Sequence, residues 1–155
     1  MREHKAISTI MTKNIIALTR EDDLERAEML FNRHKIKHIP VVSGEAIIGM
    51  LSFTDLMRIS FAETPDEENN SVESVVYNMF TIEQVMVKDV VTVTSQTTIK
   101  EVAQILAERE FHALPIVDGG VLIGIVTTTD LLIVILNFCF NVIIAINLII
   151  RILPE

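Results

Sequence analysis

The sequence predicts a mixed α/β protein built from two copies of one βαββα unit, packed sheet against sheet about a pseudo-twofold axis. Three observations favour this fold class. Half of the 155 residues are apolar and 22% are charged, which is typical of a globular chain with a substantial core. Residues 7–56 and 82–131 repeat each other without a gap. Each copy also changes from strand-like to helix-like apolar periodicity in the same order.

The repeat keeps a constant offset of 75 residues. Identical residues therefore recur at matching places in the two copies. The matched pairs include Ile7 with Ile82, Met11 with Met86, Lys13 with Lys88, Thr19 with Thr94, Pro40 with Pro115, Gly49 with Gly124 and Asp55 with Asp130. Because such repetition indicates one supersecondary plan used twice, we expect the two copies to share their order of elements.

Each copy is expected to begin with a short strand followed by an amphipathic helix. The periodicity predicts strands at 15–18 and 90–93 and helices at 24–35 and 99–110. Thr98 and Glu101 have the spacing of a capping box at a helix start, and Asp22 and Glu25 have the same spacing in the first copy.

A tight hairpin comes next in each copy. Its strands are HIPVV and AIIGMLS in the first copy and ALPIV and VLIGIVT in the second, where Asp118-Gly119 favours a hairpin turn. The second strand then runs into a last helix, predicted to begin near Thr54 or Thr129. A unit of about 50 residues buries too little apolar surface alone, so the copies are expected to pack on each other.

These elements divide the chain into four parts. Residues 1–62 form the first copy, and 72–131 form the second, with a leading helix at 72–80 that is expected to lie against the second copy. Residues 63–71 (ETPDEENNS) are acidic and lack an apolar period, as in a linker. Residues 132–155 form an apolar tail.

The candidate ligand site lies at the end of each copy, in the octapeptides GMLSFTDL and GIVTTTDL. Helix N-termini present unpaired N–H groups that suit phosphate, and the hydroxyls of Ser52, Thr54, Thr127 and Thr129 add donors. The carboxylates of Asp55 and Asp130 suit the vicinal hydroxyls of a ribose. Gly49 and Gly124 leave room for a close approach to the strand. The alternative is that these polar residues only cap the last helices.

Residues near the hairpin prolines are further candidates. Lys37, His38 and His112 can offer positive charge to a phosphate, although solvated strand ends have the same composition. Pro40 and Pro115 suit strand starts and can also lie beside a flat adenine.

No motif for catalysis or a metal site accompanies these residues. The chain lacks a Gly-rich phosphate loop ending in Lys-Ser/Thr, a His-Glu-x-x-His pair and a Gly-x-Ser-x-Gly elbow. We therefore expect no enzyme activity, no metal and no required cofactor.

The pattern resembles the cystathionine beta-synthase (CBS) domain family, whose members occur as tandem βαββα pairs. The resemblance covers residues 7–131 and rests on HIPVV/ALPIV, on the Gly-x-x-Ser/Thr-x-Thr-Asp endings and on their duplication. It implies that the aspartates hold ribose and the hydroxyls approach phosphate. It also implies adenine contacts around Ile16, Ala17, Ile39, Val91, Thr92 and Leu114. The implied ligands are AMP, ADP, ATP, S-adenosylmethionine or a similar adenosyl compound, and the implied assembly is a homodimer acting on an unidentified effector protein.

Charge and cysteine content limit the partners. A net charge of −8 disfavours nucleic acid. The lone Cys139 excludes an intramolecular disulfide, and the N-terminal MREHKAIST lacks the apolar run of a secretory signal. The chain is therefore expected to be cytoplasmic.

The tail departs from the family pattern, because residues 131–153 carry no charge before Arg151. As a helix of about 35 Å it is long enough for a membrane anchor, although three asparagines count against this. A dimer helix packing through Leu131, Val134, Ile135 and Phe138 is the second reading, and a frameshifted ending is the third. The main expectation for function is a regulatory module that senses an adenine nucleotide or adenosyl compound in the cleft between the two copies. The alternative is a dimerisation scaffold that binds no ligand and that, in one version, is tethered to a membrane through this tail.

Overall fold

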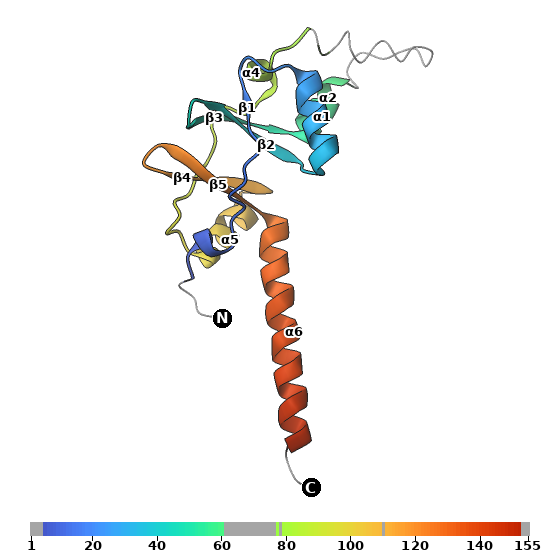
Figure 1. Ribbon diagram of the computed structural model, residues 1–155, viewed down its shortest axis with the longest axis vertical. Helices are drawn as coiled ribbons and strands as arrows, with labels where there is room; N and C mark the ends of the chain where they lie inside the picture. Colours follow the sequence, from blue (N-terminus) through green and yellow to red (C-terminus); the bar gives the residue numbers. More distant parts are fainter. Residues whose placement is uncertain (1–4, 61–76, 78, 110, 153–155) are drawn as a thin grey trace, which may run out of the picture.

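The computed structural model describes residues 5–60, 77, 79–109 and 111–152, and its order of elements repeats (Figure 1). The expected linker at 63–71 lies outside these residues. The elements are the 3₁₀ helix η1 (Ile7–Thr9), β1 (Leu18–Thr19), α1 (Leu24–His34), β2 (His38–Ser43), β3 (Ala46–Ser52), α2 (Phe53–Ser60), α4 (Ile82–Val85), α5 (Ile99–Glu108), β4 (Ala113–Asp118), β5 (Val121–Thr127) and α6 (Thr128–Ile152).

The two hairpins confirm the repeat strand by strand. Strands β2 and β3 pair antiparallel, as do β4 and β5, and both ladders shift register at the same place, between Val41 and Val42 and between Val117 and Ile116. Gly44 takes a positive φ in the first turn, and Gly119 and Gly120 do so in the second. This left-handed backbone explains why both turns contain glycine.

The strands expected at the start of each copy are shorter than predicted. In the first copy only Leu18–Thr19 forms a strand, parallel to Val41 and Val42. In the second copy a single bridge joins Val93 to Ile116. The prediction was wrong in extent because only the last apolar residue of each run reaches the edge of the hairpin.

The helix starts confirm one predicted cap and correct the other. Thr98 and Glu101 form a full capping box at α5. At α1 the cap is Asp23, whose carboxylate accepts from the Arg26 N–H. Asp22, the predicted cap, instead accepts hydrogen bonds from the backbone N–H and hydroxyl of Thr19. Two adjacent aspartates offered the same chemistry, and the sequence pointed to the wrong one.

Each copy begins with a segment that precedes its first strand, here called its leading segment. Each leading segment pairs with the hairpin of the other copy. Thr12, in the leading segment of the first copy, pairs with Ile125 in β5 of the second, and Val87, in the leading segment of the second copy, pairs with Met50 in β3 of the first. These two bridges are themselves related by the 75-residue repeat. The exchange ties each copy to the other through main-chain hydrogen bonds.

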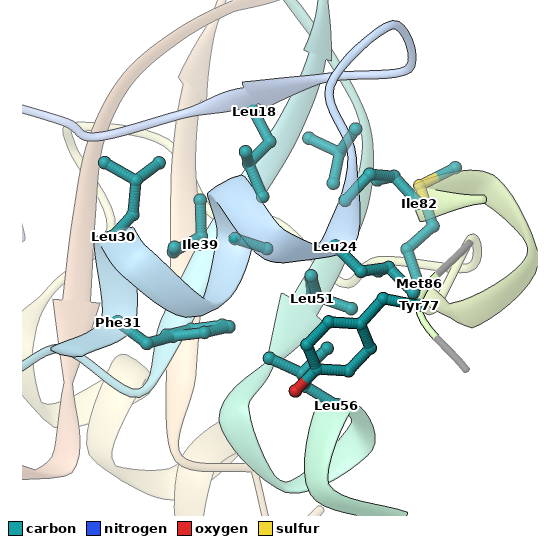
Figure 2. Close-up of a cluster of buried hydrophobic side chains, with 12 residues drawn as sticks. Leu18, Leu24, Leu30, Phe31, Ile39, Leu51, Leu56, Tyr77, Ile82 and Met86 are labelled. Atoms are coloured by element: carbon teal, nitrogen blue, oxygen red, sulfur yellow. The ribbon is translucent and has the colours of Figure 1, made fainter. Parts of the chain in front are cut away.

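The two hydrophobic cores reflect the same exchange. One contains Leu18, Leu24, Ile39, Leu51 and Leu56 of the first copy together with Tyr77, Ile82 and Met86 from the segment leading to the second (Figure 2). The other contains Val102, Leu114, Ile116 and Val126 of the second copy together with Ile7. Of the leading helix expected at 72–80, only Tyr77, Met79 and Phe80 are described. Tyr77 packs on the first copy rather than the second.

The repeated glycines in β3 and β5 accommodate this packing. A Cβ on Gly49 would clash with Sδ of Met86, and one on Gly124 would clash with Sδ of Met11. Both methionines come from the exchanged leading segments. The close approach expected from the sequence is therefore made by a thioether side chain of the other copy's leading segment.

Helix α6 leaves the body of the molecule after its first turns (Figure 1). Leu131 is buried in the second core, whereas Ile135 and Phe138 from the predicted packing face are about half exposed. Among the residues that the structure describes, no helix is long and apolar enough to cross a membrane.

Candidate functional site

Ser52 and Asp55 form a compact unit where β3 gives way to α2. The backbone N–H and hydroxyl of Ser52 both donate to Oδ2 of Asp55, and the Asp55 N–H donates back to the Ser52 hydroxyl oxygen. The capping expected as an alternative is therefore present. The second carboxylate oxygen, Oδ1, lies 3.6 Å from Nη1 of Arg58, a side chain that is 75% exposed. Such an exposed contact is weak, so Oδ1 can still accept from a ligand.

Thr127 and Asp130 repeat this arrangement at the junction of β5 and α6. The N–H and hydroxyl of Thr127 each donate to Oδ2 of Asp130 at 2.7 Å, and the Asp130 N–H donates to the Thr127 hydroxyl oxygen at 3.3 Å. The two junctions are thus equivalent in local hydrogen bonding.

A cavity of about 350 Å³ lies against the first of these junctions. It is lined from the first copy by His38, Met50, Ser52 and Asp55, and from the second by Val87, Asp89, Val90, Val91, Phe111, His112, Ala113 and Leu114. Its size falls in the usual range for small-molecule sites. Because both copies supply its walls, the cavity depends on how the copies are packed together.

Two imidazoles face each other at this cavity. The rings of His38 and His112 lie 6.4 Å apart between centroids and are tilted by 44°. Burial lowers the pKa of His38 below its usual range, and the neighbouring His112 lowers it too, while Asp55 acts in the opposite direction and Lys37 adds a smaller lowering. His38 is therefore neutral at pH 7, and a nearby anion would favour its protonated form.

The remaining walls divide into an apolar part and an acidic part. Val90, Val91, Phe111 and Leu114 offer apolar surface suited to a flat ring, whereas the carboxylates of Asp55 and Asp89 are the acidic groups. Such a mixture of apolar surface with a few convergent polar groups is typical of ligand pockets.

The structure brings six of the residues predicted from the sequence to this cavity. They are His38, Ser52, Asp55, Val91, His112 and Leu114. The others lie elsewhere. Ile39 is fully buried in the first core and Ile16 packs against it, Pro40 and Pro115 are buried within the hairpins, and Thr92 lines a groove beside α5. Lys37, Ala17, Thr54 and Thr129 are not part of this cavity's lining, and Thr127 and Asp130 belong to the second junction.

Sequence reasoning missed half of the lining. Met50, Val87, Asp89, Val90, Phe111 and Ala113 were not predicted. Three of them, Val87, Asp89 and Val90, belong to the exchanged leading segment, and a repeated sequence does not indicate which copy such a segment joins. Among the described residues, no group of three or more His, Cys, Asp or Glu could hold a metal ion.

Comparison with known proteins gives consistent matches along most of the chain. The CBS domain family matches twice, at residues 7–62 and 82–137. A putative acetoin utilization protein (AcuB) from Vibrio cholerae has a similar crystal structure, with 27% sequence identity and a TM-score of 0.72 over 86% of this chain and 92% of that one. The crystal structure of CBSX2 in complex with AMP has a TM-score of 0.72 at 22% identity, over 86% of this chain and 97% of that one.

A curated relative is similar over a shorter part of its own length. Inosine-5'-monophosphate dehydrogenase from Korarchaeum cryptofilum is 30% identical over 127 residues, which cover 81% of this chain and 23% of that enzyme. Across the first relatives that it matches, the chain spans from about a quarter to about half of their length.

Proposed function

Because the chain belongs to the CBS domain family and contains two of its domains in tandem, we propose that it is a regulatory module without chemistry of its own. In this proposal it binds an adenine nucleotide or related adenosyl compound in the cavity between its two copies. The observation that carries the proposal is the position of Asp55, whose carboxylate lines a cavity of about 350 Å³ built by both copies.

The chemistry of the lining supports each part of such a ligand. Oδ1 of Asp55 can accept a hydrogen bond from a ribose hydroxyl while Oδ2 stays paired with Ser52. Val90, Val91 and Leu114 give the apolar surface that an adenine ring needs. The imidazoles of His38 and His112, whose ring centroids lie 6.4 Å apart, can donate hydrogen bonds to a phosphate.

The repeat supports a second site around Asp130. Adding 75 residues to Ser52 and Asp55 gives Thr127 and Asp130, and subtracting 75 from Asp89 and His112 gives Asn14 and Lys37. In this proposal the second site holds phosphate with the ammonium group of Lys37 rather than with an imidazole. The two sites would therefore differ in affinity for the same ligand.

The AMP complex of CBSX2 guides the choice of ligand for testing. At 22% identity its likeness to this chain concerns the fold alone. AMP is thus the first compound to try, with ADP, ATP and S-adenosylmethionine as related adenosyl compounds.

Regulation would follow from the shared walls of the cavity. A ligand that touches both copies stabilises the packing in which the cavity fits it, and so shifts the population of arrangements. An effector protein that prefers one arrangement would then respond to the ligand.

A scaffold that binds no ligand is the second candidate. It is favoured by the internal pairing of Ser52 with Asp55, which gives both residues a structural role. It is also favoured by the exposed apolar side chains of α6, since such surface commonly marks a protein interface.

Thermal unfolding with added compounds separates the two candidates. A sensor is expected to gain about 3 kcal/mol of stability at a ligand concentration one hundred times the dissociation constant, because the ligand binds only the folded state. The gain should keep rising with the logarithm of the ligand concentration and should be smaller for Asp55→Ala. A melting temperature unchanged by AMP, ADP, ATP and S-adenosylmethionine would support the scaffold instead.

A further inference from the structure

Two histidines from different copies face each other at the cavity, and the repeat does not reproduce this pair. The ring centroids of His38 and His112 lie 6.4 Å apart. Adding 75 residues to His38 gives Ala113, and subtracting 75 from His112 gives Lys37. The imidazole pair is therefore a feature of the cavity at Asp55, and the equivalent positions at the second junction have no histidine.

The main chain of each copy fixes its own histidine. His38 begins β2 and pairs with Ser52 at the end of β3. The carbonyl oxygen of His112 accepts a hydrogen bond of 3.1 Å from the Thr128 N–H at the start of α6. Because each histidine is held by one copy while its ring faces the histidine of the other, the separation of the rings depends on how the copies are packed.

The two imidazoles are the side-chain donors that this cavity can offer to a phosphate. Among the described residues that line it, the other side-chain donor is the hydroxyl of Ser52, which already donates to Asp55. The carboxylates of Asp55 and Asp89 repel an anion. A neutral imidazole has one N–H and one bare nitrogen, which accepts rather than donates. Protonation of a ring therefore adds both a donor and a positive charge.

The charged groups around His38 make its protonation sensitive to a ligand. Burial lowers the pKa of His38 most, His112 lowers it further, Asp55 raises it, and Lys37 gives a smaller lowering. The exposed carboxylate of Asp89 lines the same cavity. The ring is thus neutral near pH 7 in the free protein. A phosphate dianion in the cavity acts in the same direction as Asp55 and favours the protonated ring.

We propose that this cavity takes up a proton together with the phosphate of its ligand, and that the pair of His38 and His112 carries this proton. The proposal rests on the proposed function, since it concerns the same cavity and an adenosyl ligand that bears phosphate. Because the rings are close, the proton belongs to the pair rather than to one ring. The chain then responds to acidity as well as to nucleotide.

The direction of the pH dependence follows from linkage. A ligand that raises the pKa of the pair binds most tightly below the pKa of the free protein. Its affinity falls as the pH rises through the interval between the free and the bound pKa, and it is constant again above that interval. Uptake of one full proton corresponds to about a tenfold loss of affinity for each pH unit within the interval.

The charge of the ligand decides whether a proton is taken up. AMP brings a phosphate that is mainly dianionic above about pH 7, because its second pKa is about 6. Adenosine lacks the phosphate and should bind without proton uptake. S-adenosylmethionine carries a sulfonium, which disfavours a protonated ring beside it. Its affinity should therefore stay constant or rise with pH, whereas that of AMP should fall.

Isothermal titration calorimetry with AMP counts the protons. Titrations at about pH 7.5 in HEPES and in Tris, whose ionisation enthalpies differ, give the number of protons taken up from the difference in heat. The proposal predicts net uptake with AMP and none with adenosine. The AMP dissociation constant should rise at least about threefold between about pH 7 and about pH 8.5. Repeating the titrations on Asp130→Ala confines binding to the described cavity.

The repeat supplies a matched variant. His38→Ala combined with His112→Lys gives this cavity the residues of the second junction. An ordinary lysine keeps its proton across this range, so the double variant should bind AMP with no proton uptake and with the same affinity at both pH values. His34→Gln, an exposed histidine at the end of α1, is the control and should behave like the original chain.

The ring signals of His38 and His112 in NMR spectra give an independent readout, assigned with the single variants His38→Gln and His112→Gln. Saturating AMP should move the titration midpoint of at least one ring to higher pH. Midpoints that AMP leaves in place would overturn the proposal. Proton uptake that persists in the double variant would overturn it too, because the proton would then lie elsewhere.

These outcomes separate the proposal from the proposed function. Saturable AMP binding that requires Asp55, but takes up no proton and is equally tight at both pH values, would overturn the proton coupling and leave the nucleotide site standing. If neither AMP nor the other adenosyl compounds bind to the folded chain, both proposals fall together.

Discussion

Asp55 illustrates how one residue can serve both structure and ligand binding. Its Oδ2 atom is held by Ser52 at the start of α2, while Oδ1 meets only the exposed Arg58 within the described contacts. The sequence offered capping and ribose binding as alternatives. The geometry makes them compatible, because they use different oxygens of one carboxylate.

The environment of His38 leads to a prediction about pH. Its pKa is lowered in the folded protein, chiefly by burial, so below about pH 6.5 the unfolded chain binds a proton before the folded one does. Stability is therefore expected to fall as the pH drops from the ordinary histidine pKa toward the lowered one. Above that window His38 is neutral in both states and adds no pH dependence to stability.

Thermal melts at about pH 7.5 and about pH 5.5 check this linkage. His38→Gln should lose less stability on acidification than the original chain. His34→Gln, which removes an exposed histidine at the end of α1, is the matched control. If His38→Gln and His34→Gln respond alike to pH, the burial argument for His38 is wrong.

Gly49 gives a second prediction at the scale of single residues. A Cβ at this position would meet the side chain of Met86, so Gly49→Ala should cost about 1–3 kcal/mol of unfolding free energy. Met86→Ala should cost about 2–5 kcal/mol by leaving a cavity. Since the second change removes the clash made by the first, the double variant should lose less than the sum. Additive losses in urea unfolding would contradict the contact.

At the scale of elements, the repeat predicted the hairpins, the main helices and their order, but not which copy each leading segment joins. From the sequence alone, Met11 could pack on either Gly49 or Gly124, and so could Met86, whereas the structure places Met11 on Gly124 and Met86 on Gly49. A repeated sequence satisfies the same contacts whether segments stay or exchange. The pattern therefore could not place Val87, Asp89 and Val90 in the cavity, although it identified Asp55, His38 and His112.

Helix α6 provides the prediction at this scale. Leu131 belongs to the second core and is 9% exposed, whereas Ile135, one turn later, is 49% exposed. Leu131→Ala should therefore cost about 2–5 kcal/mol. Ile135→Ala, which removes a similar number of carbon atoms, should change stability by no more than about 0.5 kcal/mol. Equal losses in urea unfolding of the monomeric protein would mean that α6 packs on the body beyond its first turn.

At the scale of the whole molecule, the exchange makes the two copies one cooperative unit. Each core contains residues from the segment leading to the other copy, and main-chain bridges join Thr12 to Ile125 and Met50 to Val87. The cavity is built from the same exchanged parts. Whatever fills it must therefore act on the packing of both copies, which is the physical basis of the proposed regulatory role.

The most direct test of adenosyl binding in the cavity at Asp55 is isothermal titration calorimetry. The original chain, Asp55→Ala and Asp130→Ala are each titrated with AMP, and then with ATP and S-adenosylmethionine. The two variants lose the same local cap, but only Asp55→Ala removes a carboxylate from the described cavity. The original chain should show saturable binding. In Asp55→Ala the affinity at one site should fall by at least about tenfold, whereas Asp130→Ala should keep the affinity of that site. Binding unchanged by Asp55→Ala, or no saturable heat with any of the three compounds on folded protein, would contradict this account.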